Sequence, residues 1–357
     1  MQERTNLKFF DDKTSEDAAL AAKYVLTADL EEVRKIAERN PTVLYRTTQG
    51  VNPVGRTIKG TIYQMALGAG DVKLPLNGVE DYLIKDRTIE RQNDIGIVEL
   101  LGSILLKQPD GEAESIRQFK SYFPTGWQPK VVERTFEDQA ALSAVVSAIL
   151  NATEYKDWDK LCIECKPAID KFKAYLINCD KEPITSGPQF NLENLWSIYA
   201  FIDRYRIYLL CPDQDGRDRN NNRMKLICEQ VLGTLQARVP ARIAQILTRG
   251  MHWVINRGEE APRILKLPEV KTEGGCAYLG EVSKVVDDFD YYGVSSHGKK
   301  LGENNFVSDR GGDHEPSIDL NPELMKCLID GINERLLSYA SLSLTAENAK
   351  AGPIIEV

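Results

Sequence analysis

Residues 60–74 constrain the fold more than any other stretch, because they combine a helix start, a helix body and a helix stop within a short span. Thr61 is suited to cap the first turn of a helix through its hydroxyl. Ala66 is small enough to allow close contact with a neighbouring helix, and Gly70 can supply the left-handed turn that ends the helix. We therefore expect a short, tightly packed helix here.

Residues 28–41 have a related organisation, in which the turn Ala28-Asp29 leads into an amphipathic run ended by Asn40-Pro41. Together the two stretches resemble ankyrin repeats, whose pattern is Thr-Pro-Leu-His-x-Ala-x-x-x-Gly followed by a polar residue. The positions that carry the resemblance are Thr61, Ile62, Tyr63, Gln64, Ala66, Gly70 and Asp71. The resemblance implies helical hairpins that form a binding scaffold, with no reaction attached to them. A pair of ordinary helical hairpins that matches the pattern by chance is the alternative.

The two turns lie 42 residues apart, whereas a regular ankyrin period is about 33. Residues 43–59 account for the surplus, and their mixture of Thr, Val, Asn-Pro and Gly predicts an extended, hairpin-like finger. A finger inserted in a repeat scaffold is a natural contact point for a protein partner. The residues expected to bind the partner are Tyr45, Arg46, Val51, Asn52 and Arg56.

The remainder of the chain predicts a mainly α fold, since apolar residues recur at helical spacing from residue 136 to 256. Pro167 marks either a kink or a break in one of these helices, and Asn191 is expected to cap another. The expected parts are an ankyrin-like region over residues 1–125 with its finger at 43–59, an irregular helical bundle over 126–258, a loop-rich segment over 259–320, a final helix over 321–345 and a flexible tail over 346–357.

Composition narrows the range of partners. The net charge of −8, with Lys and Arg scattered along the chain, argues against a nucleic-acid-binding face. The longest apolar runs, 95–106 and 140–150, are too short to cross a bilayer, so no membrane span is expected. The first residues lack the apolar core of a classical signal peptide, and seven dispersed cysteines fit reduced thiols. These features favour a cytoplasmic protein.

The sequence contains few candidates for metal-binding or catalytic residues. The pair Cys162 and Cys165 has the spacing of half a zinc site, but both lie in a helical apolar pattern and are better interpreted as core thiols. Residues 274–319 concentrate titratable groups in a loop context. Cys276, His297, His314 and Asp313 are the candidate catalytic residues there, for a thiol or metal-assisted hydrolase or transferase. The common nucleotide-binding and hydrolase motifs are missing from the sequence, and neither a cofactor nor a metal is expected.

Two functions follow from these patterns. The first is a protein–protein interaction protein, and its irregular repeat with a helical extension resembles ankyrin-bearing effectors that intracellular bacteria deliver into host cytosol by type IV secretion. That resemblance implies a host protein as partner, delivery without a classical signal peptide, and a translocation signal in the tail after Thr345. The alternative is an enzyme with its site in residues 274–319.

Overall fold

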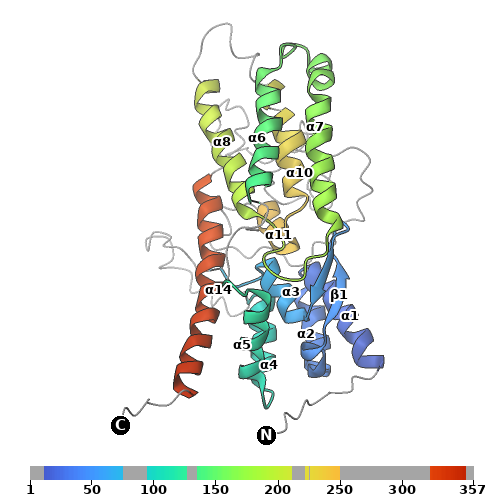
Figure 1. The fold of residues 1–357 in the computed structure, drawn as a ribbon, viewed down its shortest axis with the longest axis vertical. Coiled ribbons are helices and arrows are strands. Elements are labelled where there is room, and N and C mark those ends of the chain that lie inside the picture. The colour runs from blue at the N-terminus through green and yellow to red at the C-terminus, as the bar shows by residue number, and fades with distance from the viewer. Residues whose placement is uncertain are drawn as a thin grey trace, which may run out of the picture.

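The computed structural model describes residues 12–74, 95–126, 135–210, 222–224, 226–249 and 322–350, and within these ranges the chain is mainly α-helical, as the sequence predicts (Figure 1). The N-terminal elements are α1 (Asp12–Leu26), α2 (Leu30–Arg39), the 3₁₀-helix η1 (Pro41–Tyr45), β1 (Thr48–Val51), β2 (Thr57–Gly60), α3 (Ile62–Ala69), α4 (Ile97–Leu106) and α5 (Gly111–Tyr122). The later elements are α6 (Thr135–Asn151), α7 (Trp158–Lys181), α8 (Leu192–Leu210), the π-helical turn η3 (Cys228–Leu232), α10 (Gly233–Gln236), α11 (Ala241–Arg249) and α14 (Pro322–Lys350).

The first helical hairpin, α1–α2, is closed by the turn that the sequence indicates. Ala28 adopts the left-handed conformation with φ +55°, and Asp29 follows it. The Asp29 carboxylate accepts a hydrogen bond of 3.2 Å from the backbone N–H of Glu32, which satisfies one of the free donors of the first turn of α2. The turn therefore both reverses the chain and caps the next helix.

The second helical hairpin, α3–α4, uses the same device. Thr61 and Gln64 form a reciprocal capping box at the start of α3, and Gly70 ends the helix with φ +64°. The carboxylate of Asp71 then accepts a 3.1 Å hydrogen bond from the backbone N–H of Ile97, the first residue of α4. Asp71 thus caps a helix that begins 26 residues later.

The two helical hairpins stack on each other, α1 against α3 and α2 against α4. The connection between them is an antiparallel β-hairpin, in which Thr48 pairs with Gly60 and Val51 pairs with Thr57. This confirms the hairpin-like finger, although its first residues lie in η1 and not in a strand. We call the four helices α1–α4 together with the β-hairpin the hairpin stack.

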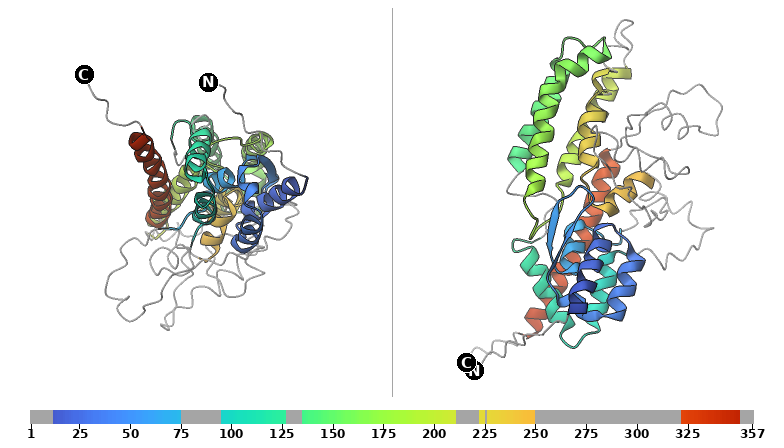
Figure 2. Two further views of the ribbon diagram at one scale, coloured as in Figure 1. Left: turned by 90° about the horizontal axis from the view of Figure 1, so that it is seen from below. Right: turned by 90° about the vertical axis from the view of Figure 1, so that its right-hand side faces the viewer.

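The bundle lies at the other end of the molecule, where α6 packs against α7, and α8 packs against α10 and α14. Figure 2 shows that α6 and α7 extend away from the hairpin stack. Helix α7 runs through Pro167 without a break. Asn191 precedes α8 as expected, but its side-chain amide donates to Asp138 on α6. Asn191 therefore joins two helices across the bundle.

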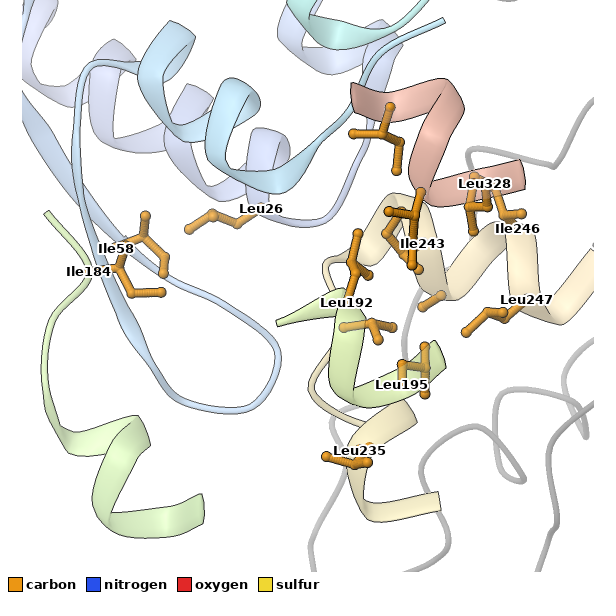
Figure 3. Packing of buried hydrophobic residues seen from close by; sticks show 14 of the residues in the cluster. Leu26, Ile58, Ile184, Leu192, Leu195, Leu235, Ile243, Ile246, Leu247 and Leu328 are labelled. Carbon is orange, nitrogen blue, oxygen red and sulfur yellow. The ribbon is translucent and has the colours of Figure 1, made fainter. Parts of the chain in front are cut away.

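Contacts far apart in sequence join the hairpin stack to the bundle. The segment between α7 and α8 runs beside β2, where Ile184 forms a parallel bridge with Ile58 (Figure 3). Further along, the Gln189 side chain donates to the carbonyl of Met65 in α3 at 2.7 Å. Helix α14 contacts both α8 and α5. The buried apolar residues of both regions form one continuous core, so the expected boundary at residue 125 does not separate two independent cores.

The last helix begins where the Asn321-Pro322-Glu323 pattern predicts, with Pro322 as its first residue. It continues to Lys350, so the first five residues of the expected tail over 346–357 are helical. The ion pair between Arg335 and Glu99, at 2.9 Å, ties this helix to α4. The expected loop-rich segment over 259–320 lies outside the described residues.

Candidate functional site

The β-hairpin has one packed face and one exposed face. Gly50 faces α1 so closely that a Cβ there would lie 2.6 Å from Cδ1 of Leu26. Successive side chains of a strand point to opposite faces, so the strand neighbours of Gly50 lie on the face away from α1. Cross-strand pairing places Gln49 beside Lys59 and Val51 beside Thr57. We call these four residues the solvent face of the hairpin. Val51, in the pair next to the turn, is 60% exposed.

Three of the five residues expected to bind a partner precede the turn of the finger: Tyr45, Arg46 and Val51. The Tyr45 hydroxyl donates to Asp110 at 2.9 Å, and burial together with this carboxylate raises the pKa of the phenol above its usual value. Tyr45 and Arg46 are half-buried, whereas Val51 is exposed. Of these three residues, Val51 is the one that is open to a partner.

The other two, Asn52 and Arg56, shape the turn of the hairpin. The Asn52 side-chain oxygen accepts from the backbone N–H of Arg56 at 2.8 Å. Arg56 is 8% exposed, and its Nε donates to the backbone carbonyl of Glu182 at the end of α7, at 3.2 Å. The turn is therefore anchored to the bundle and does not project freely into solvent.

A polar cleft of about 40 Å³ opens where this turn meets the bundle. By comparison with the space that one buried water needs, it has room for roughly three water-sized groups. Its walls combine the hairpin turn with α6, α7, the segment before α8 and the end of α10. The polar residues that line it include Asn52, Arg56, Asp138, Asp180, Asn191 and Arg238.

One charge pair in the cleft is internally balanced. Arg238 donates through Nε to Asp180 at 3.0 Å, and both side chains are largely buried. Its Nη1 also donates to the backbone carbonyl of Thr234 at 2.9 Å. Since charge and hydrogen bonds are both matched here, this pair fixes the end of α10 against α7.

Asp138 differs from that pair. It is 8% exposed and accepts from the Tyr175 hydroxyl at 2.6 Å and from the Asn191 amide at 3.2 Å. Burial and the neighbouring carboxylate raise the pKa of Tyr175, so its phenol remains a proton donor at neutral pH. In the described part of the chain, no Lys, Arg or His forms an ion pair with Asp138. The result is a buried carboxylate held by two neutral donors.

The sequence contained one signal for this arrangement that its analysis did not use. Asp138 falls on the same helical face as Leu142, Val145 and Ile149, which are buried in α6. An acid in line with a core stripe needs partners from other elements, because burying an unpaired charge is unfavourable. The identity of those partners, on α7 and before α8, depends on the tertiary fold.

The candidate catalytic residues Cys276, His297, Asp313 and His314 lie outside the described residues, so the structure does not bring them together or separate them. Within the described ranges, His, Cys, Asp and Glu side chains form no group of three that could hold a metal ion. Cys165 is buried in α7, and burial, followed by Glu164 and Cys162, raises the pKa of its thiol to about 11. A thiol of this kind fits the interpretation of Cys165 as a core residue, because metal ligation requires the thiolate.

No family model, curated protein or solved structure matches the chain. The helices in the described ranges include none that is both long and apolar enough to cross a membrane. Function must therefore be inferred from the geometry of the hairpin and the cleft.

Proposed function

We propose that this chain is a protein–protein interaction protein, whose partner binds the solvent face of the β-hairpin. The observation that carries the proposal is a hairpin that packs one face on α1 and pairs along the edge of β2 with the segment at Ile184, while Val51 is exposed on the other face. Stacked helical hairpins are a common scaffold for presenting such surfaces. The resemblance of residues 28–74 to ankyrin repeats supports the same conclusion.

Rigid anchoring matters for binding. A recognition element that is already ordered loses little conformational entropy when a partner binds. The Arg56 contact to Glu182 and the Ile58–Ile184 bridge fix this hairpin before any partner arrives. The solvent face offers an apolar side chain at Val51, with the amide of Gln49 and the cation of Lys59 beside it on the side away from the turn. A partner with an apolar residue beside an acidic one would complement it.

Affinity capture with the intact chain tests this proposal, because the two regions share one core. Val51→Asp places a charge on the solvent face, and Ile163→Asp makes the corresponding change at a 72% exposed site on α7. Partners retained by the wild type and by Ile163→Asp should be lost from Val51→Asp. Identical partner sets for all three baits would contradict the proposal.

The resemblance to ankyrin-bearing effectors extends the proposal to a host protein as partner, reached by type IV secretion into host cytosol. A reporter enzyme fused to the N-terminus of the chain tests this in an intracellular bacterium. Reporter activity should appear in host cytosol when the secretion system is intact and disappear when it is deleted. Activity that remains inside the bacterium in both strains would overturn this part of the proposal while leaving the interaction role in place.

A further inference from the structure

One side of the cleft, at Asp138 and Asn191, has hydrogen-bond acceptors that are not fully used. An ionised carboxylate offers about four lone-pair positions. The Asp138 carboxylate uses two of them, for Tyr175 and Asn191. Asn191 is 5% exposed, and its own Oδ1 accepts no hydrogen bond. An occupant that donates hydrogen bonds would complete this side of the cleft.

The arrangement of charges in the cleft supports the same conclusion about its occupant. Asp180 is matched by Arg238 within ion-pair distance. The Arg56 guanidinium, on the facing hairpin turn, is a second cation that lines the cleft, and its Nε–H donates to the carbonyl of Glu182. Among the described residues, Asp138 accepts hydrogen bonds from two neutral groups, and no guanidinium or ammonium lies within ion-pair distance of its carboxylate. A buried carboxylate without a counter-charge is unfavourable unless something positive can reach it.

We propose that this cleft binds the cationic end of a side chain, the ammonium of a lysine or the guanidinium of an arginine, supplied by the protein partner. Both groups carry a positive charge that would pair with the Asp138 carboxylate, and both only donate hydrogen bonds. A volume of about 40 Å³ has room for such an end group. The source of the side chain rests on the proposed function, because the cleft adjoins the hairpin that the partner is proposed to contact.

Small cations test the cleft without the partner. The ¹⁵N-labelled intact chain is titrated with methylammonium, guanidinium, acetamide or tetramethylammonium, with ionic strength held constant by sodium chloride. The readout is the side-chain amide signal of Asn191, assigned by its loss in Asn191→Ser. Methylammonium or guanidinium should shift this signal with saturation at about 1–50 mM, the range open to ions of so few atoms. The neutral acetamide and the bulky, donor-free tetramethylammonium should not shift it.

The matched variants are Asp138→Asn, which removes the charge with little change of shape, and Tyr175→Phe, which keeps the charge. Binding of methylammonium should disappear in the first and persist in the second. Equal shifts for acetamide and methylammonium, or unchanged binding by Asp138→Asn, would overturn the inference. The four wild-type titrations decide the question even if a variant fails to fold.

The two proposals can fail separately. If Val51→Asp loses the partner while neither small cation binds, the interaction role stands and the cationic occupant is wrong. If the cations bind while Val51→Asp and the wild type capture the same proteins, the cleft stands and the hairpin face is not the partner surface.

Discussion

Two buried polar residues, Gln118 on α5 beside the hairpin stack and Asp138 at the edge of the bundle, each join separate elements, yet their hydrogen-bond networks are built differently. Gln118 is 0% exposed. Its Nε2 donates to the Leu44 carbonyl at 2.8 Å and to Glu114 at 2.7 Å, and its Oε1 accepts from the Thr61 hydroxyl. Asp138 has two neutral donors and retains unused acceptor capacity.

This difference separates a structural network from a binding site. A fully satisfied network specifies one arrangement of its elements, and here it fixes η1, α3 and α5 together. A buried charge with unused acceptors contributes less to stability than an uncharged alternative would. Features that violate the rules of a stable fold tend to occur at functional sites. The comparison therefore supports a structural role for Gln118 and the proposed binding role for Asp138.

The largest expected effect comes from breaking the satisfied network. Gln118→Leu removes the donor to Leu44 and the acceptor of Thr61, which leaves both groups buried without these partners. Urea unfolding should show a loss of about 2–4 kcal/mol in the free energy of unfolding. Gln139→Leu, at an exposed position of α6, is the control and should change stability by less than about 0.5 kcal/mol. Equal effects at the two sites would remove the structural role of Gln118.

The next effect tests the turn of the hairpin stack. Gly70 has φ +64°, and a Cβ there would also lie 3.2 Å from Cγ2 of Ile332. Gly70→Ala should therefore lower the free energy of unfolding by about 1–2 kcal/mol, and Gly70→Val by about 1–3 kcal/mol. Gly102→Ala, inside α4, should instead stabilise by about 0.5–1 kcal/mol, since a Cβ there meets only ordinary contacts. A rise in melting temperature for Gly70→Ala would contradict the left-handed turn.

The smallest change in stability is expected at Asp138. In Asp138→Asn, the introduced amide can keep its oxygen toward the Tyr175 hydroxyl and direct its nitrogen at Asn191. The Asn191 amide can then rotate to accept this bond with its unused Oδ1. The free energy of unfolding should stay within about 0.5 kcal/mol or rise by up to about 1 kcal/mol. A loss of 2 kcal/mol or more, measured by urea unfolding, would assign Asp138 a structural role like that of Gln118.

The sequence predicted features whose physics is local. The Thr61 cap and the left-handed Gly70 each depend on a few neighbouring residues, and both are present. The mixture of Thr, Val, Asn-Pro and Gly in residues 43–59 also predicted the finger. The hydrogen bond by which Asp71 caps α4 at Ile97 was not predicted, because 26 positions of sequence separate the capping residue from the start of the helix. The helical end of α14 at Lys350 also exceeded the expected limit, since no strong stop residue is present between 345 and 350.

The candidate site was less accessible to sequence reasoning. Val51 was expected at the surface and is exposed, but Arg56 was expected to face a partner and is anchored to Glu182. That contact joins residues 126 positions apart, which no local pattern reveals. The meeting of Asp138 with Asn191, 53 positions apart, has the same origin. Both contacts exist because the segment after α7 returns along the β-hairpin.

The most direct test of the central claim is the dissociation constant of the captured partner, measured with the wild type and with Asp138→Asn. Removing one member of a buried charge pair across an interface costs about 2–5 kcal/mol. Because Asp138 is proposed to bind a cation and not to hold the fold, its neutral variant should bind at least about tenfold more weakly while remaining as stable as the wild type. An unchanged dissociation constant in a fully folded Asp138→Asn protein would contradict the account.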